Sequence, residues 1–275
     1  MSSVHPAEAT RLLVEVPEEG GSIVVTTVVG ENQFTGNRIV LILRETGKLE
    51  LRGSLGLEEA NDSVIALMKH VLNNHRESDS LHEIRTADHF FEIYIEVRRP
   101  VQELVVVGAG HIAQPLAHLG DLLGFRVIVI DDRPEFATRE RFPSAEKVIR
   151  ADFSNPFREA PLHRRSHVLL VTRGHKYDYA CLVIALKMDP PPAYIGMIGS
   201  RRRVRATYVQ LLDEGIEHSL LDRIHAPVGL DVGAETPEEI AVAVAAELIM
   251  VKRGGTGVSL KGIERIAERF FKENQ

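Results

Sequence analysis

The chain has 275 residues, of which 44% are hydrophobic, and a formal net charge of −6. This length and hydrophobic content predict two domains, and charges of both signs indicate neither a nucleic-acid surface nor a membrane patch, although local basic clusters remain open. One cysteine, Cys181, excludes an internal disulfide framework. No start typical of a signal peptide and no apolar run of about 18 residues is present, which predicts a soluble, cytoplasmic protein.

The first part of the chain predicts a small antiparallel sheet covered by a helix. Four segments are typical of strands: residues 22–29, 38–44, 49–52 and 90–97. Residues 57–72 carry apolar residues at helical spacing. Arg98, Arg99 and Pro100 then separate this region from the next strand. We therefore predict a smaller N-terminal α+β domain over residues 1–99 and a second domain over residues 100–275.

Residues 103–132 (ELVVVGAGHIAQPLAHLGDLLGFRVIVIDD) have the pattern of a strand, a turn, a helix and a second strand. Gly108, Gly110 and Ala113 form a GxGxxA motif, which allows a tight turn, the approach of a pyrophosphate and close packing of the helix. Amide hydrogens at the helix start then face an anion, and Asp131 follows where an acid accepts from a ribose hydroxyl. The alternative interpretation is a purely structural glycine turn.

Strands and helices alternate through the rest of the chain. The predicted strands are residues 147–150, 167–172 and 193–198, and the predicted helices are residues 177–187 and 201–214. Thr236, Pro237 and Glu239 open a further helix with a capping box, and Gly254 ends it. Ser259 then opens an amphipathic last helix. This alternation predicts an α/β fold, a Rossmann-like doubly wound parallel sheet with helices on both faces.

Topology predicts where a ligand binds in such a sheet. Ligands lie outside the carboxyl ends of the strands where the strand order reverses, here between the first and fourth strands. The loops after several strands then meet in one crevice, where arginines pair with phosphate or carboxylate. The cofactor-binding candidates are Gly108, Ala109, Gly110, His111, Ile112, Asp131, Asp132, Arg133, Thr172, Arg173, Gly174, His175, Gly199, Ser200 and Arg201. The catalytic candidates are His175 and Asp178.

The charged candidates each have a structural alternative. Asp131 either accepts from a ribose or forms an ion pair with Arg133 together with Asp132. Arg173 and its neighbours in the same loop either orient a substrate or form a local ion pair. The run of arginines from Arg201 either is a solvated helix start or has an anionic ligand or an acidic partner, because cations are disfavoured at a helix N-terminus.

Four other features each have a structural explanation. His111 either contacts the ligand or caps its helix. Cys181 lies among apolar residues and is expected in the core. The histidines show no metal-ligand spacing, so we predict no metal site. His225, Asp231 and Glu235 flank a glycine-rich loop and are expected only to shape it.

Six stretches resemble a known family when taken in order and spacing: GAGHIAQPLA, VIDDRPEFA, RFPSAEKVI, VTRGHKYD, YIGMIGSRRRV and HAPVGLDVGAETPEEIA. They are similar to the xanthine dehydrogenase accessory factor family (XdhC/CoxI type), over about residues 92–255. The resemblance implies a C-terminal Rossmann domain and a role in maturing a molybdenum hydroxylase such as xanthine dehydrogenase. Such proteins bind the molybdenum cofactor (molybdopterin), hold it while a sulfur-donating desulfurase completes it, and deliver it to the apo-enzyme.

The N-terminal half departs from the family pattern at one turn. The family has a cysteine followed by Leu-Glu in a glycine-rich turn, whereas residues 53–59 (GSLGLEE) contain none. A thiolate is a natural soft ligand for molybdenum, so its absence argues against metal ligation by this domain. The chain is then expected to bind the nucleotide part.

Three functions remain open on the sequence alone. The first is the accessory factor, the second an oxidoreductase that uses NAD(P) with His175 as general acid, and the third a non-catalytic nucleotide-sensing module. Arginines and glycines outnumber titratable groups on these loops, which favours the carrier. Phe270 and Phe271 would place two large apolar side chains on the surface of the predicted last helix. Burial of these side chains against a second copy of the chain predicts a homodimer. We expect no nucleic-acid partner and no membrane partner.

Overall fold

The chain folds into two compact units, Met1–Val101 and Gln102–Gln275, in a computed structural model that describes residues 2–74, 78–86 and 89–264. The boundary expected from the sequence lay after residue 99. Each unit has its own sheet and its own hydrophobic core.

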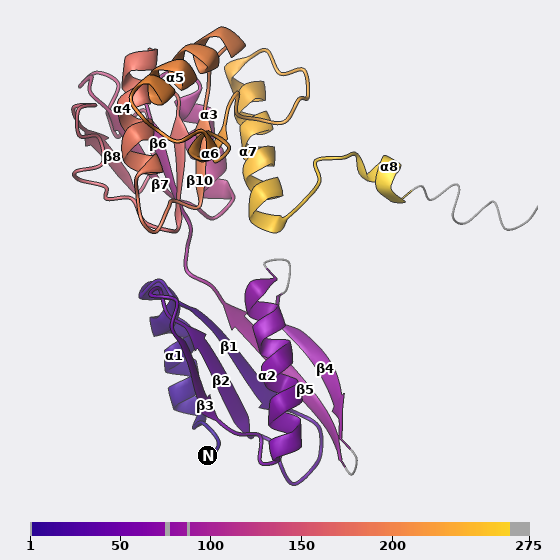
Figure 1. The fold of residues 1–275 in the computed structure, drawn as a ribbon. Coiled ribbons are helices and arrows are strands. Elements are labelled where there is room, and N and C mark those ends of the chain that lie inside the picture. The colour runs from indigo at the N-terminus through magenta and orange to yellow at the C-terminus, as the bar shows by residue number, and fades with distance from the viewer. Residues whose placement is uncertain (1, 75–77, 87–88, 265–275) are drawn as a thin grey trace, which may run out of the picture. The chain divides into compact units, whose positions relative to one another are not determined.

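The described residues of the first unit form a five-stranded antiparallel sheet in the order β3-β2-β1-β5-β4 (Figure 1). The strands are β1 (Ser22–Val28), β2 (Arg38–Leu43), β3 (Leu49–Gly53), β4 (Ser80–Arg85) and β5 (Phe90–Arg98). Helices α1 (Pro6–Glu18) and α2 (Glu58–Asn73) cover opposite faces, because Leu12 of α1 packs with Ile23 and Val64 of α2 packs with Val24. The predicted α+β class is confirmed.

Two elements of this unit were not predicted. Helix α1 begins at Pro6, and only Ala9, Leu12 and Val16 of its residues are buried, so its apolar stripe is narrow. Strand β4 has the sequence SLHEIR at the edge of the sheet, where none of its residues is fully buried. Short, half-polar segments of this kind give a weak periodic signal.

The described residues of the second unit form a six-stranded parallel sheet in the order β11-β10-β9-β6-β7-β8. The strands are β6 (Glu103–Val107), β7 (Arg126–Asp131), β8 (Lys147–Arg150), β9 (Ser166–Leu170), β10 (Tyr194–Met197) and β11 (Ile224–His225). The helices are α3 (Ala113–Leu122), α4 (His175–Leu186), α5 (Arg201–Asp213), α6 (His218–Leu221), α7 (Pro237–Arg253) and α8 (Leu260–Glu264). This order is that of a doubly wound Rossmann sheet, as predicted.

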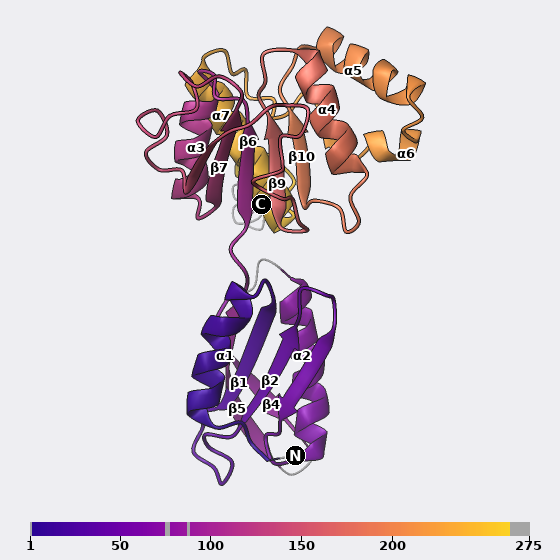
Figure 2. The same cartoon turned by 90° about the vertical axis from the view of Figure 1, so that its left-hand side faces the viewer.

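Strand β6 lies at the centre of this sheet and is buried along its whole length. Leu104 and Val106 belong to the core under α3 and α7, and Val105 and Val107 belong to the core under α4 and α5. Figure 2 shows the two pairs of helices on the two sides of the sheet. A strand buried on both faces is a continuous apolar run, which is why VVV marked this element in the sequence.

Helix α7 has the ends that its sequence predicted. The hydroxyl of Thr236 accepts from the backbone N–H of Glu239, whose side chain accepts from the backbone of Thr236, and Gly254 ends the helix with a left-handed φ of 63°. Helix α8 falls within the predicted last helix, but Phe270 and Phe271 lie outside the described residues. The homodimer therefore stays a prediction.

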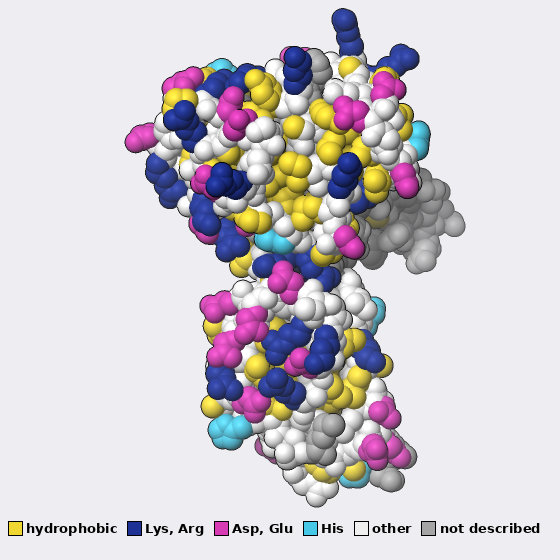
Figure 3. Space-filling model, turned by 60° about the vertical axis from the view of Figure 1, so that its left-hand side comes forward, with side chains coloured by type: hydrophobic (Ala, Val, Ile, Leu, Met, Phe, Trp, Pro, Cys, Tyr) yellow, Lys and Arg dark blue, Asp and Glu magenta, His cyan; other side chains and the backbone are white. Residues whose placement is uncertain are grey.

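Both signs of charge are present on the surface of each unit. On the face drawn in Figure 3, Lys and Arg side chains lie among Asp and Glu side chains. Within the described ranges, no helix combines the length and the apolar character that a membrane span needs.

A buried carboxylate fastens α7 to the sheet. Glu247 accepts from the hydroxyl of Tyr194 at 2.6 Å and from the backbone N–H of Gly229 at 2.7 Å. His225 Nδ1 lies 2.9 Å from Oε1 of the same carboxylate. The ring of Tyr194 stacks on that of His225 at 4.5 Å between centroids. Buried carboxylates need such partners, because an unpaired charge is costly in the core.

We expect Tyr194→Phe to destabilise the protein by about 1–2 kcal/mol, because it leaves the buried Glu247 with one donor fewer. Tyr179→Phe is the matched control, since the Tyr179 hydroxyl meets Glu214 at an exposed position, and it should change stability by less than about 0.5 kcal/mol. Urea unfolding followed by circular dichroism measures both. Equal effects of the two variants would contradict the role of the buried carboxylate.

Candidate functional site

The turn after β6 and the turn after β9 are in direct contact. Gly108 has a φ of +105°, and a Cβ on it would lie 2.6 Å from the carbonyl oxygen of Val171 and 3.1 Å from the Cα of Thr172. Strands β6 and β9 are neighbours, and the strand order reverses between them. The structure therefore brings together the two turns that the sequence placed at the switch point.

The N-terminal end of α3 leaves backbone amides unused. Ala113 N donates to the carbonyl of Gly110 at 3.2 Å, but the structure shows no acceptor, among the residues it describes, for the N–H groups of Gly110, His111 and Ile112. A Cβ on Gly110 would meet nothing within 4 Å. Open space beside unengaged amides at a helix start favours an anion.

The carboxylate of Asp131, the last residue of β7, accepts a hydrogen bond from the glycine turn. Its side chain is 1% exposed, accepts from Ala109 N at 2.6 Å, and accepts from Nε and Nη2 of Arg133 at 2.9 Å each. Burial raises the pKa of Asp131, but the hydrogen bonds from Arg133 and from the backbone outweigh it and lower the pKa to about 2. The structure thus shows the ion pair with Arg133, and the ribose contact stays a prediction.

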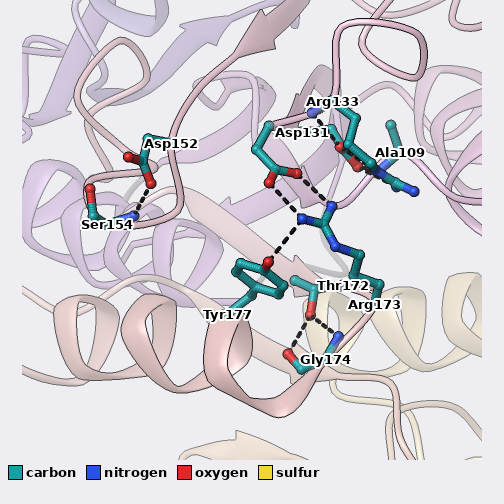
Figure 4. Close-up of polar contacts among 10 residues, drawn as sticks. Ala109, Asp131, Arg133, Asp152, Ser154, Thr172, Arg173, Gly174 and Tyr177 are labelled. Carbon is teal, nitrogen blue, oxygen red and sulfur yellow. Dashed lines mark hydrogen bonds and ion pairs between the residues drawn. The ribbon is translucent and has the colours of Figure 1, made fainter.

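A second ion pair crosses the end of β6. The Arg173 guanidinium donates to both oxygens of Asp132 at 2.7 Å. It also donates to the Tyr177 hydroxyl at 2.9 Å (Figure 4). Arg173 follows β9 and Asp132 follows β7, and these strands flank β6 on its two sides. The pair therefore spans the carboxyl end of β6, with side chains that are 38% and 26% exposed.

A third pair is buried beside the turn after β9. Asp178 is 0% exposed, lies 2.6 Å from the Thr172 hydroxyl and accepts from Arg203 Nε at 2.8 Å. Arg203 thus has the acidic partner that was one explanation for the arginine run. Arg201 and Arg202 are exposed. A fully buried, paired carboxylate is badly placed to exchange protons with a ligand, which weighs against Asp178 as a catalytic residue.

The other candidates occupy the ends of helices. His111 is exposed at the glycine turn, and Ile112 precedes the first residue of α3. Gly174 is the N-cap of α4, and the side chain of its first residue, His175, lies outside the described part. Ser200 caps α5 by accepting from Arg203 N at 3.3 Å.

The loops after β10 and β9 are joined through one side chain. Gly199 lies against Arg203, because a Cβ on Gly199 would be 3.2 Å from Arg203 Cδ. Arg203 Nη2 also donates to the carbonyl of Thr172 at 3.0 Å. These contacts fix the loop after β10 beside the turn after β9.

The single cysteine, Cys181, is buried. Burial raises the pKa of the Cys181 thiol to about 12, as expected of a core residue. His225 pairs with Glu247, far along the chain from the glycine turn. Within the described ranges, no three His, Cys, Asp or Glu side chains gather as a metal site.

Sequence reasoning assigned no role to one arginine that touches the glycine turn. Arg141 Nη2 donates to the carbonyl of Ala109 at 3.1 Å and to Gln114 Oε1 at 3.3 Å. Its residue lies in the motif RFPSAEKVI, which was the available signal. Arg141 lies in a loop, and a loop has no hydrophobic periodicity from which its path could be predicted. Its return to the glycine turn was therefore not visible in the sequence.

We expect Gly108→Ala to destabilise the protein by about 2 kcal/mol or more, because it adds a Cβ at positive φ against the backbone of Val171. Gly110→Ala is the control, since the added Cβ meets open space; its effect should stay within about 0.5 kcal/mol. Thermal unfolding of both variants checks this. A Gly108→Ala protein as stable as the wild type would show that the two turns do not touch.

We expect Asp131→Asn to cost about 2 kcal/mol at neutral pH, because the lowered pKa of Asp131 means that its charged form stabilises the fold. This contribution is present above the ordinary pKa near 3.8 and is lost as pH falls toward about 2. Urea unfolding at a series of pH values should therefore show the two proteins converging in acid. A constant difference down to about pH 2.5 would argue against the ion pair.

Comparison with known proteins agrees with this fold. Over 166 residues the chain is 33% identical to the Uncharacterized protein YqeB of Escherichia coli (strain K12), and the match covers 60% of this chain and 30% of that protein. Over 169 residues it is 34% identical to a probable xanthine dehydrogenase subunit from Bacillus subtilis (strain 168), and the match covers 60% of this chain and 48% of that protein. The matches thus span less than half the length of either relative.

A solved structure shares the fold of the whole chain. It is described as a xanthine dehydrogenase from Bacillus halodurans, is 21% identical, and aligns over 98% of this chain and 71% of that one with a TM-score of 0.64. The family described as the XdhC Rossmann domain matches residues 104–248, which is more than half of the 275 residues and includes every loop of the site described above. The chain belongs to the XdhC family, through this Rossmann domain.

Proposed function

We propose that the protein is an accessory factor for the maturation of a xanthine dehydrogenase-type molybdenum hydroxylase. In this proposal it binds the molybdenum cofactor, or its nucleotide, at the glycine turn and delivers it to the apo-enzyme. The family and the name of the Bacillus subtilis relative support the assignment to xanthine dehydrogenase systems. The site supports an anionic ligand.

One observation carries the proposal: the contact between Gly108 and Val171, which sets three unengaged amides at the switch point. The molybdenum cofactor carries a terminal phosphate, or, in its nucleotide form, a pyrophosphate that joins the pterin to the nucleoside. The amides of Gly110, His111 and Ile112 are donors of the kind that hold such groups at a helix start. The residues therefore fit the phosphate end of the cofactor.

The same residues do not offer a thiolate to the metal. The chain's one cysteine is the buried Cys181. At the turn where the family has its cysteine, Ser54 Oγ accepts from the backbone N–H of Gly56 at 3.0 Å and from Asn61 Nδ2 at 2.9 Å. When bound, the cofactor supplies a redox-active metal centre for the client enzyme. This chain's part in the proposal is to bind the phosphate end and leave that centre to its partners.

The pair of Arg173 and Asp132 gives a simple route for loading and release. Both side chains are partly exposed, and such pairs contribute about 0–1 kcal/mol. A phosphate bound at the turn would replace Asp132 as the partner of Arg173. Little free energy would be lost, because the pair that is broken contributes little. When the ligand leaves, Arg173 returns to Asp132. We propose that a desulfurase and the client enzyme meet the loaded form, and that the protein works as a cytoplasmic homodimer.

An oxidoreductase that uses NAD(P) is the second candidate. The strand order around the GxGxxA turn is that of dinucleotide-binding domains, which favours it. The engagement of Asp131 by Arg133 and the burial of Asp178 weigh against it. Oxidation of NADH or NADPH by the purified protein with a panel of carbonyl compounds would support this function over the first.

We expect the wild-type protein, purified from a host that makes molybdenum cofactor, to retain a pterin, and Gly110→Ala to lower its occupancy about tenfold. The added methyl would occupy the space that the phosphate needs, while leaving the fold intact. The pterin is measured by oxidation to its fluorescent derivative, and native mass spectrometry reports the bound mass. Wild-type protein that carries no pterin and takes up none from purified molybdopterin would overturn the proposal.

A further inference from the structure

Helix α7 carries apolar side chains on the face that it turns away from the core. Ala241, Val244 and Leu248 belong to the core beneath the helix. Val242 and Ile249 lie on the opposite side and are 55% and 43% exposed. A helix that covers a sheet normally has polar residues on its outer face. The outer face of α7 therefore has the composition of a contact surface.

The one charged residue between Ile240 and Val251 does not lie on this face. It is Glu247, which is buried and accepts from the hydroxyl of Tyr194 and from the backbone N–H of Gly229. An ordinary amphipathic helix has its charged residues outside. In this stretch of α7 the charge is inside and the outer positions are apolar, so contact with water does not explain them.

The residues of the outer face form a line along the helix. Glu238, Val242, Ala246, Ile249 and Arg253 follow one another at intervals of three or four residues, which places them on one side of an α-helix. Ala246 is partly buried, and the other four are exposed. The line therefore has an apolar middle, an acid at its first end and a base at its last.

This line is complementary to itself when two copies of the helix run in opposite directions. Val242 and Ile249 have the same midpoint in sequence as Glu238 and Arg253, immediately before Ala246. A two-fold axis at that point sets Val242 against Ile249 of the second copy, and Glu238 against Arg253 of the second copy. The small Ala246 lets the two helices approach closely at the axis, and a small crossing angle keeps both ends within reach.

The charges favour this arrangement over a parallel one. In two parallel copies Glu238 would meet Glu238 and Arg253 would meet Arg253, and like charges repel. In antiparallel copies each acid meets a base, and the two helix dipoles also point in opposite directions. Exposed ion pairs add little affinity, so the apolar residues supply most of the attraction and the charges set the direction.

We propose that the outer face of α7 is the interface between two copies of this chain, related by a two-fold axis beside Ala246. The inference rests on the homodimer named in the proposed function, to which it assigns a surface, and it does not depend on the ligand. The occupant is a second copy because the face is matched to itself in charge and in the positions of its apolar residues. A contact of one helix pair is smaller than a standard interface of about 800 Å² per partner, so we expect the dimer to dissociate in the micromolar range.

The test is sedimentation velocity of the full chain over a range of concentrations. At about 50 µM the wild type should approach twice the chain mass of 30.6 kDa. Val242→Glu should weaken association about tenfold or more, because it sets a charge against the apolar Ile249 of the second copy. Val209→Glu is the matched control: Val209 is 50% exposed on α5, and this variant should associate as the wild type does. Circular dichroism shows whether both variants are folded.

A charge reversal tests the antiparallel direction. Glu238→Arg alone and Arg253→Glu alone should each weaken association about threefold or more, because each sets like charges against one another. The double variant should restore the association to within about twofold of the wild type. At about 1.5 Å of rise per residue, the two positions lie too far apart on one helix to meet within one chain. Rescue therefore reports a pair between copies, and loss without rescue would contradict it.

Three results would overturn the inference. A wild type that stays monomeric at about 50 µM has neither this interface nor the homodimer. A folded Val242→Glu protein that stays dimeric has its interface elsewhere, and loss of the dimer with Phe270→Ser instead would assign it to the last helix of the sequence. Equal loss in Val209→Glu would deny α7 a particular role. Pterin retention is measured separately, so failure of the cofactor proposal leaves this interface standing, and failure of the interface leaves the cofactor site standing.

Discussion

The absence of a side chain at residue 108 is the constraint on which the site depends. Because Gly108 has no Cβ, the turn after β6 lies against the backbone of Val171. That contact places the start of α3 beside the loop after β9, and Asp131 holds the turn from the other side through Ala109 N. A side chain at residue 108 would separate the turn after β6 from the loop after β9. The backbone amides at the start of α3 would then no longer lie beside that loop.

Three acids and three arginines surround this turn in pairs: Asp131 with Arg133, Asp132 with Arg173, and Asp178 with Arg203. They range from a fully buried acid to one in a partly exposed pair. The pairs of Asp132 with Arg173 and of Asp178 with Arg203 join loops that are distant in sequence. Removing one partner of a buried pair is costly, because it leaves an uncompensated charge in the core. The exposed pair is the one that a ligand displaces most easily, because its net contribution is small.

The sequence predicted the sheet better than the site. Strand β6 was clear because a central parallel strand is apolar throughout, and the strand order follows from alternating strands and helices. The position of Gly108 against the loop after β9 followed from that topology. The partners of single side chains did not follow. Asp178 was chosen as a catalytic candidate because it lies near the switch point, yet Arg203 neutralises it in the core. Arg141 reaches the turn through a loop whose path has no period to detect.

The ion pair that spans the carboxyl end of β6 has a further consequence for ligand binding. Within the described residues, Asp132 forms its ion pair with Arg173 alone. A ligand that draws Arg173 away would leave the Asp132 carboxylate without its partner, so a filled protein would carry a negative charge where the empty protein has a neutral ion pair. A protein surface with a cation opposite that spot would therefore associate with the filled form more readily than with the empty one.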